Sequence, residues 1–434
     1  MADQGTIRVS LDGPDGGDDD RFGRFRLIGW WDQSRLARAK VLVIGAGALG
    51  NEIIKNLALL GVGNVLIADM DRIENSNLSR SALYRASDNG KLKADVAASA
   101  AKDLYPDGRY HAFNGNVVYD LGIGVFRWAD VVIGGLDNRE ARLAINRACF
   151  RLGKPWIDGA IEQINGVARV FVPPDGPCYE CTMSEMDWRL LQHRRSCNLL
   201  SRGEMETGGK TPTTPTVSSI IAGVQTQEAV KLLHGMEAIA GRGWVFNGLS
   251  AEAYQIDYQR KDACYSHDML DPVVALPARA DSITVRQLLD EARERLGPAA
   301  ELELARDVLE KLVCPKCGAT EQLFASLGRV SAEKAWCPSC TDVRREVVTF
   351  FKIRGDEPFL DRTLAEIGVP AFDIVIARSP VDGRSLGLEL SWDAVNVLGT
   401  LGGDAGRGLT HGTSPSRDEA ALPPTAGAEE LEWT

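Results

Sequence analysis

The alternation of short apolar runs with helix-spaced apolar segments, which begins at Lys40, most constrains the fold of this chain. Residues 41–45 read VLVIG and residues 65–69 begin VLIA, which is typical of strands buried on both faces. Residues 48–60 between them carry apolar residues at helical spacing. The pattern continues, with helices expected at 91–104, 139–152 and 217–234, and strands near 111–113 and at 130–137, 167–172 and 243–260. Such alternation predicts an α/β fold with a doubly wound, mostly parallel sheet.

The length and net charge of the chain, together with its cysteine usage, exclude several classes of protein. The chain has 434 residues, a net charge of −11 and 44% apolar residues. This length suits two or three globular domains, and the acidic balance argues against nucleic acid or an acidic membrane surface as a partner. The sequence has no apolar run of about 18 residues and no signal-peptide pattern, so neither a membrane span nor secretion is expected. Nine cysteines, mostly in metal-type pairs, favour a reducing compartment and hence the cytoplasm.

Shifts in composition predict the domain boundaries. Residues 1–20 and 401–434 are rich in polar residues and glycine, and we expect both ends to be disordered. The first domain is expected over 21–271, with a long polar loop at about 186–216. Residues 272–282 are expected as a linker, followed by a C-terminal α+β region at 283–400. Within that region the pattern predicts helices near 284–296 and 303–312 and a strand at 347–353.

Eight soft metal ligands stand in four pairs, each with a two-residue gap. The pairs are Cys178/Cys181, Cys264/His267, Cys314/Cys317 and Cys337/Cys340. Eight ligands suffice for two closed tetrahedral zinc sites, which would be structural because four protein ligands leave no open position. The last two pairs have the spacing of a self-contained zinc ribbon, so we expect an independent zinc-ribbon module whose loss leaves the function of the first domain largely intact. An alternative joins 178/181 with 314/317, which requires longer-range chain closure.

A glycine-rich turn predicts a nucleotide site. Gly45, Gly47 and Gly50 form Gly-x-Gly-x-x-Gly directly after a predicted strand and at the start of a predicted helix. Such glycines allow a close backbone approach to a phosphate at the helix N-terminus. Asp69 ends the next strand, where a carboxylate can accept a hydrogen bond from a ribose hydroxyl. The alternatives are an unliganded glycine turn and an NAD-dependent oxidoreductase.

Charged residues further along favour phosphate chemistry over hydride transfer. Arg80 and Lys93 follow the predicted second strand, and Asp137 follows a later one. Cations stabilise charge on phosphates and a carboxylate can hold Mg²⁺, whereas hydride transfer needs neither. Each residue alone could be a solvated surface charge, but together they indicate phosphoryl or nucleotidyl transfer.

From Arg21 to about His267 the sequence resembles the ubiquitin-activating enzyme family, which includes ThiF/MoeB-type bacterial adenylyltransferases of molybdopterin and thiamine synthesis. The resemblance rests on five motifs in the family's order: RFGRF, VLVIGAGALGNEIIKNLALLGVGNV, DMDxIxxSNLxR, GKxKAD and LDN. It departs from the family at Ser81, where glutamine is usual, and this puts the glutamine's contact in doubt. The family's fold implies a Rossmann-like adenylation domain.

The resemblance also implies roles for individual residues. Gly45, Gly47, Gly50 and Asp69 would hold ATP, Asn77, Arg80 and Lys93 would bind its phosphates and support adenylation, and Asp137 would be linked to Mg²⁺. Arg24 would reach the ATP of a partner subunit, which implies a homodimer.

Two further expectations come with the family. Its members often carry a pair of metal ligands at each of two points, which here correspond to 178/181 and 264/267. Members that go beyond adenylation carry an acceptor cysteine after the first pair. Cys197 fits this position and follows two arginines, which would lower its thiol pKa, although an incidental loop cysteine is the alternative. Cys149, the other cysteine outside the pairs, is expected to pack within a helix.

The sequence therefore predicts an enzyme that adenylates the C-terminal glycine of a ubiquitin-like or sulfur-carrier protein and then forms a thioester on Cys197. A downstream conjugating enzyme would be a further partner. Three alternatives remain: adenylation alone in the service of sulfur transfer, an NAD-dependent dehydrogenase, and a non-catalytic subunit of a heterodimeric activator.

Overall fold

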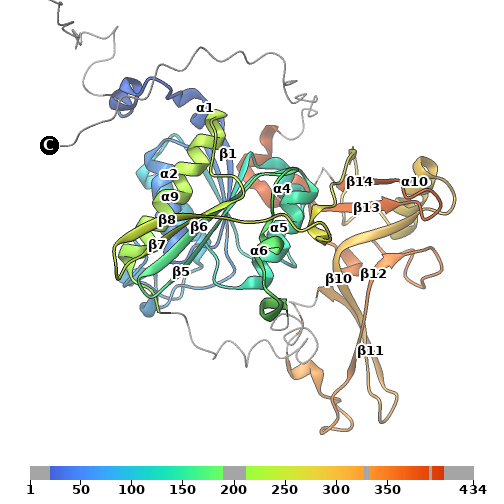
Figure 1. Cartoon of the computed structure of the whole chain (residues 1–434). Helices are drawn as coiled ribbons and strands as arrows, with labels where there is room; N and C mark the ends of the chain where they lie inside the picture. Colours follow the sequence, from blue (N-terminus) through green and yellow to red (C-terminus); the bar gives the residue numbers. More distant parts are fainter. Residues whose placement is uncertain (1–19, 189–211, 327–329, 331, 391–392, 405–434) are drawn as a thin grey trace, which may run out of the picture.

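The computed structural model describes residues 20–188, 212–326, 330, 332–390 and 393–404 (Figure 1). Most of the expected disordered ends, 1–20 and 401–434, lie outside the described residues, as does most of the polar loop 186–216. Within the described ranges, no helix combines the length and the apolar character needed to cross a membrane.

An eight-stranded sheet forms the first part of the molecule, with strand order β3-β2-β1-β4-β5-β6-β7-β8. The pairings from β3 to β5 are parallel and those from β5 to β8 are antiparallel. The predicted doubly wound, mostly parallel sheet is therefore confirmed, with an antiparallel extension. The strands are β1 Lys40–Ile44, β2 Asn64–Ala68, β3 Arg109–Phe113, β4 Val131–Gly134, β5 Trp156–Glu162, β6 Asn165–Phe171, β7 Arg242–Asn247 and β8 Glu252–Asp257.

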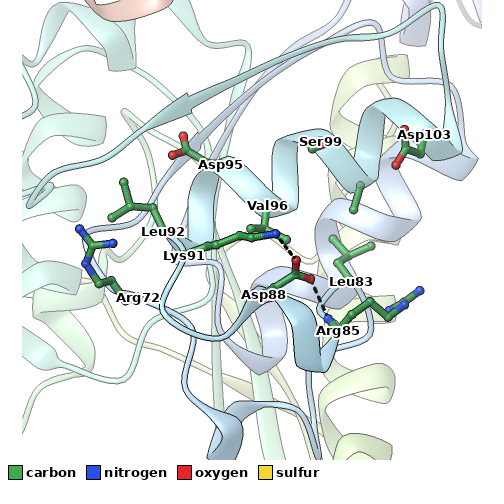
Figure 2. A pocket seen from close by; sticks show the side chains of 11 residues that line it. Arg72, Leu83, Arg85, Asp88, Lys91, Leu92, Asp95, Val96, Ser99 and Asp103 are labelled. Atoms are coloured by element: carbon green, nitrogen blue, oxygen red, sulfur yellow. Dashed lines mark hydrogen bonds and ion pairs between the residues drawn. The ribbon is translucent and has the colours of Figure 1, made fainter.

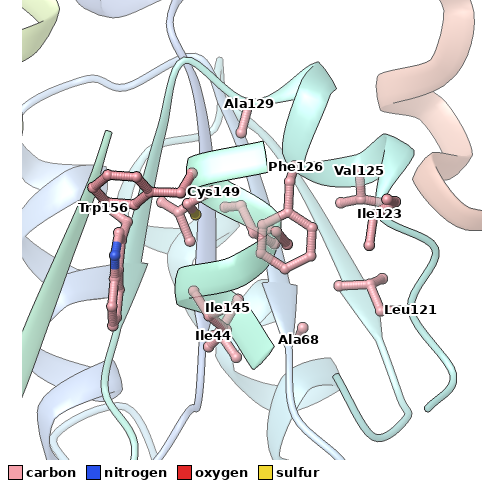
Figure 3. Close-up of a cluster of buried hydrophobic side chains, with 14 of the residues drawn as sticks. Ile44, Ala68, Leu121, Ile123, Val125, Phe126, Ala129, Ile145, Cys149 and Trp156 are labelled. Carbon is pink, nitrogen blue, oxygen red and sulfur yellow. The ribbon is translucent and has the colours of Figure 1, made fainter. Parts of the chain in front are cut away.

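Helices cover both faces of this sheet because its central strands β1, β2 and β4 are apolar and buried on both sides. One face packs against α2 (Ala48–Leu59), α3 (Lys93–Leu104) and α9 (Pro215–His234), and the other against α4 (Gly124–Trp128) and α5 (Arg139–Arg151). Figure 3 shows the second face, where Phe126 and Ile145 pack near Ile44. Cys149 is fully buried there, as expected, and burial raises the pKa of its thiol well above the ordinary value. Shorter elements are η1 Gly23–Leu27, α1 Gln33–Arg38, η2 Asn75–Asn77, η3 Ala86–Asp88, α6 Tyr179–Thr182 and η4 Tyr265–His267.

A second sheet has the order β11-β10-β13-β14-β9, and β12 also pairs with β10. The strands that come first and last in the sequence, β9 and β14, are parallel neighbours in this sheet. The core of the second sheet includes the apolar face of α10. In Figure 1 the long strands β10, β11 and β12 extend away from the first sheet. The elements are β9 Val273–Leu276, α10 Val285–Leu296, β10 Glu301–Val313, β11 Thr320–Ser326, η6 Ala332–Ala335, β12 Glu346–Ile353, η7 Ala365–Ile367, β13 Ile374–Arg378 and β14 Ser385–Leu390.

Two expectations for this region are wrong. The predicted helix at 303–312 is strand β10, although the stretch is rich in helix formers. It pairs with three strands, and a bulge between Leu309 and Lys311 changes its register, so cross-strand pairing and burial override its helix propensity. The expected linker 272–282 contains β9, which is part of the second sheet.

The last described segment returns to the first sheet. Helices α11 (Ala394–Leu398) and η9 (Gly399–Asp404) contact β3, and α11 also contacts α4. Val397, Leu398 and Leu401 are buried in the same cluster as Phe126. The C-terminal segment thus completes the apolar core on this face of the first sheet.

Candidate functional site

The glycine turn lies between β1 and α2 and adopts the close geometry that its sequence predicts. Gly45 has φ +92°, and a Cβ built there would lie 2.5 Å from the carbonyl oxygen of Gly135. A Cβ at Gly50 would lie 1.9 Å from the carbonyl oxygen of Gly45. Gly47, the N-cap of α2, has open space around it. Two glycines are therefore required by packing, and the third leaves the N-terminus of α2 open to an anion.

Asp69, at the end of β2, is part of the same turn. Its carboxylate accepts hydrogen bonds from the backbone N–H of Ala46 at 2.6 Å and of Asp71 at 2.8 Å. Burial raises the pKa of this carboxyl, while the Lys93 ammonium and the two N–H donors act in the opposite direction. Asp69 thus stabilises the turn itself, in addition to the ribose contact that the sequence predicts.

Lys93 begins α3 and faces the loop after β2. Its ammonium lies 2.7 Å from a carboxylate oxygen of Asp71, and its side chain is only 12% exposed. Backbone hydrogen bonds from Ile73 to Lys91 and from Lys93 to Asp71 hold this loop against the start of the helix. Lys93 is therefore placed at the carboxyl edge of the sheet, beside the turn.

Asn77 and Arg80 lie on the same loop, but their side chains make local contacts. The Asn77 side-chain oxygen accepts from the Glu74 N–H at 3.0 Å, and the Arg80 guanidinium donates to the Ser76 carbonyl at 2.9 Å. To contact phosphates, both side chains would have to give up or share these bonds.

Asp137 follows β4 and is exposed. Just before it, the N–H of Gly135 donates to the carbonyl of Ile44 at 2.8 Å, which joins this loop to the end of β1. Just after it, Asn138 caps α5 by accepting from the Ala141 N–H at 2.7 Å. Strand order reverses between β1 and β4, and the carboxyl ends of strands at such a point form the usual ligand crevice of an open α/β sheet.

A buried ionic network supports the Asp137 loop. The Arg142 guanidinium lies 2.7 Å from a carboxylate oxygen of Asp158 and also donates to the carbonyls of Leu136 and Gly159. Arg169 contacts the other Asp158 oxygen at 2.6 Å. Asp158 is fully buried, and an arginine pairs with each of its two carboxylate oxygens.

Two other supporting residues were not predicted from the sequence. The Asn51 side chain donates to the Ala46 carbonyl at 2.7 Å, and the Tyr84 hydroxyl lies 2.6 Å from the same oxygen. Their partners are backbone atoms, and no sequence pattern marks such a contact.

A hollow of about 640 Å³ lies on the outer side of α3 (Figure 2). Within it, Asp88 accepts from the Arg85 backbone N–H and from the Lys91 ammonium, each at 2.9 Å. None of the predicted nucleotide-binding residues lines it, so it is separate from the glycine turn.

The eight predicted metal ligands form two groups of four. One group is Cys178, Cys181, Cys264 and His267, and the other is Cys314, Cys317, Cys337 and Cys340; within each, the ligand atoms all lie within 4.8 Å of one another. This agrees with the expected pairing and not with the alternative. The Sγ atoms of Cys178 and Cys264 are 3.5 Å apart, and those of Cys314 and Cys340 are 3.9 Å apart.

These separations fit a tetrahedral zinc ion. With Zn–S distances of about 2.3 Å, two sulfur ligands lie about 3.8 Å apart. In the first group, Glu180, which lies between Cys178 and Cys181 in the sequence, is buried. It accepts a hydrogen bond from the hydroxyl of Ser266, which lies between Cys264 and His267 in the sequence. This bond links the two halves of the group across the chain.

Of the two remaining predicted residues, Arg24 lies away from the turn. Arg24 is exposed on η1, and Phe22 of the same segment packs over Gly61, just beyond the C-terminal end of α2. Because α2 has 12 residues, about 18 Å of helix separates that end from the glycine turn. Cys197 lies outside the described residues.

Comparison with known proteins adds independent findings. The ThiF family model matches residues 20–266. The sulfur carrier protein adenylyltransferase of Thermus thermophilus is 30% identical over 280 residues, which is 62% of this chain and 94% of that protein. The SAMP-activating enzyme E1 of Haloferax volcanii is 30% identical over 249 residues, 56% of this chain and 87% of that protein. The NEDD8-activating enzyme E1 catalytic subunit of Schizosaccharomyces pombe is 39% identical over 150 residues, 33% of this chain and 34% of that protein.

Proposed function

This chain belongs to the ThiF family, and from that premise we propose that it uses ATP to adenylate the C-terminal glycine of a carrier protein and then accepts the carrier on Cys197 as a thioester. It is an adenylyltransferase or activating enzyme, as its relatives are named. Its substrate is a ubiquitin-like or sulfur-carrier protein. The observation that supports the proposal is that Asp71, which Lys93 contacts, the glycine turn and the loop with Asp137 follow the carboxyl ends of the neighbouring strands β2, β1 and β4.

The proposed first step forms an acyl-adenylate. An oxygen of the carrier's terminal carboxylate attacks the α-phosphorus of ATP, and the bond from that phosphorus to the leaving oxygen breaks and releases pyrophosphate. Negative charge builds up on the phosphate oxygens, and Lys93 and Arg80 supply cations at this edge. Asp137 would hold the Mg²⁺ that neutralises the leaving pyrophosphate.

In the proposed second step, the Cys197 thiolate attacks the carbonyl carbon of the acyl-adenylate and AMP leaves. A mixed anhydride is a reactive acyl donor and a thiolate is a suitable nucleophile. One comparison favours a simpler alternative, because the Thermus relative is named for adenylation of a sulfur carrier. In that case the reaction would end at the adenylate, and no conjugating enzyme would follow.

We propose that Arg24 acts on the nucleotide of a second copy of the chain. Phe22, two residues before it, packs over Gly61 beyond the far end of α2, about 18 Å of helix from this chain's own glycine turn. Leu27, Ile28 and Trp30 beside it are 82%, 37% and 44% exposed, an apolar surface that a partner subunit could cover. A homodimer would therefore bury this segment and complete each active site.

Both groups of four ligands are proposed to hold structural zinc. A cytoplasmic location, where thiols stay reduced, would keep the seven cysteines among them available. A non-catalytic subunit is disfavoured, since such a subunit need not keep the full set of ATP-site residues.

Pyrophosphate–ATP exchange tests the adenylation step. Exchange should depend on a candidate carrier that ends in glycine, and Lys93→Ala or Asp137→Ala should abolish it by removing a phosphate cation or the metal ligand. Lys102→Ala, near the opposite end of α3, is the control and should retain exchange. If the chain reduced NAD and showed no exchange with any glycine-terminated carrier, the proposal would be wrong.

A non-reducing gel tests the thioester. Wild-type enzyme with ATP and carrier should form a covalent adduct that thiol reagents remove, and Cys197→Ala should keep exchange but lose the adduct. Cys149→Ala is the matched control and should keep the adduct, because that thiol is buried. An adduct that survives in Cys197→Ala would move the acceptor role elsewhere, and its absence from wild type would favour adenylation alone.

A further inference from the structure

The part of the chain that forms the second sheet, here called the second region (residues 273–390), holds residues 119–123, which lie between β3 and α4, through hydrogen bonds. Arg306 on β10 donates to the carbonyls of Tyr119 and Leu121 at 3.0 and 3.2 Å, and its guanidinium lies 3.1 Å from both carboxylate oxygens of Asp373. Asp373 in turn accepts from the Ile123 N–H at 2.8 Å. Both charged side chains are less than 10% exposed, so each depends on the other. The segment 119–123 therefore has a fixed position relative to β10.

The same segment packs against the first sheet. Leu121 and Ile123 belong to the apolar cluster that contains Phe126 of α4 and Ile145 of α5 (Figure 3). It thus lies between the second region on one side and α4 and α5 on the other.

The side chain of Tyr119 extends this contact to the four-cysteine ribbon. It is 6% exposed and clusters with Leu309 and Leu312 of β10 and with Ala335 of η6. Leu312 comes two residues before Cys314, and Ala335 comes two residues before Cys337. The Tyr119 ring therefore packs against residues that immediately precede both cysteine pairs.

The hydroxyl of Tyr119 contacts α5 of the first sheet's helical layer. It donates a hydrogen bond of 2.9 Å to a carboxylate oxygen of Glu140. Glu140 lies in the first turn of α5, just after Asn138, the residue that caps this helix, and three residues after Asp137. A single side chain thus contacts the ribbon cluster and the helix start that carries Asp137.

We propose that Tyr119 is a positioning residue through which the metal-bound ribbon holds Asp137 in place for the magnesium nucleotide. This rests on the proposed function, because it takes Asp137 as the Mg²⁺ ligand. When a metal joins the four cysteines, it fixes the apolar cluster of Tyr119, Leu309, Leu312 and Ala335. The Tyr119 hydroxyl then orients the first turn of α5 through its hydrogen bond to Glu140. The ribbon would not be the independent module that the sequence predicts, and its loss would weaken the nucleotide site.

The test measures binding of ATP by calorimetry over a Mg²⁺ titration, which needs no carrier protein. Tyr119→Phe keeps the ring and removes the hydroxyl, and it should raise the Mg²⁺ concentration required for half-maximal binding by about five- to tenfold. Glu140→Ala should act in the same way, whereas Glu140→Gln keeps an acceptor and should stay close to wild type. Tyr110→Phe is the matched control, because the Tyr110 hydroxyl on β3 has no hydrogen-bond partner among the described residues.

A double-mutant cycle tests the link to the ribbon. Cys337→Ser should lose one zinc ion and raise the Mg²⁺ requirement in the Tyr119 protein, but should add little in the Tyr119→Phe protein, which retains both zinc ions before the second change. Equal Mg²⁺ dependence of Tyr119→Phe and wild type, or additive effects in the cycle, would overturn this inference and leave the proposed function intact. A wild type that binds no ATP would overturn both.

Discussion

Substituting alanine at Gly47 and at Gly50 should separate nucleotide binding from folding, although the two residues lie in one turn. At Gly50 the new Cβ would lie 1.9 Å from the Gly45 carbonyl oxygen, a backbone atom that cannot move without opening the turn. At Gly47 the new Cβ would meet no atom within 4 Å, and φ is −76°, which alanine adopts readily. The first substitution should therefore damage the fold, and the second should not.

The expected magnitudes differ accordingly. Overpacking against a backbone atom costs about 3 kcal/mol or more, which lowers the melting temperature of a domain of this size by roughly 6–12 °C. At the N-cap, alanine costs about 0.5–1 kcal/mol relative to glycine, and the reduced freedom of the unfolded chain offsets a similar amount. The Gly47→Ala protein should therefore melt within about 2 °C of wild type.

The Gly47→Ala substitution, which should leave the stability nearly unchanged, should weaken nucleotide binding. A methyl group at Gly47 occupies the space through which a phosphate would reach the N-terminus of α2, and loss of one charge-assisted hydrogen bond there weakens binding by about 10- to 100-fold. Calorimetry with Mg·ATP and a thermal melt of each variant give both quantities. If Gly47→Ala bound ATP as tightly as wild type, phosphates would not approach the turn at this residue and the assignment of the site would be refuted.

Two other predictions concern the metals and pH. Elemental analysis should find two zinc ions per chain, Cys178→Ser should lose one of them, and Cys149→Ala should keep both; one zinc or none in wild type would contradict the two-site assignment. Burial raises the pKa of Asp69 above 3.8, so the folded protein holds this proton to a higher pH than the unfolded chain. Stability then falls as pH rises from 3.8 through the raised folded value, and Asp69→Asn should remove this part of the pH dependence of chemical denaturation. An identical pH profile in the variant would show that Asp69 ionises alike in both states.

Several features could be predicted because they depend on residues close together in the chain. The turn with Gly45 and Gly50 and the carboxylate of Asp69 all belong to one β–α–β unit, and this unit brings the ends of β1 and β2 together by its own geometry. Each Cys-x-x-Cys pair is likewise local. Their assembly into two groups of four agreed with expectation because the ribbon is short in sequence and the other group matches a known family pattern.

The failures have a common cause. Residues 303–312 have helical propensity, yet β10 forms because β11, β12 and β13 pair with it and bury its apolar residues. Strand β5 was not predicted, nor was the Arg142–Asp158 pair, in which an arginine on α5 compensates a buried carboxylate on that strand. Such partners are specified by where distant segments pack.

The sequence by itself determined the alternating α/β pattern, the glycine turn, the charged residues at the strand ends and the four ligand pairs. These depend on chain spacing over a few residues, which sets helical or strand periodicity and ligand reach. The tertiary structure decided that β10 is a strand, that residues 394–404 complete the core of the first sheet, and that Tyr119 lies between the ribbon and α5. The physical reason is that burial and pairing between distant segments contribute more free energy than local preference, and only the folded chain shows which segments meet.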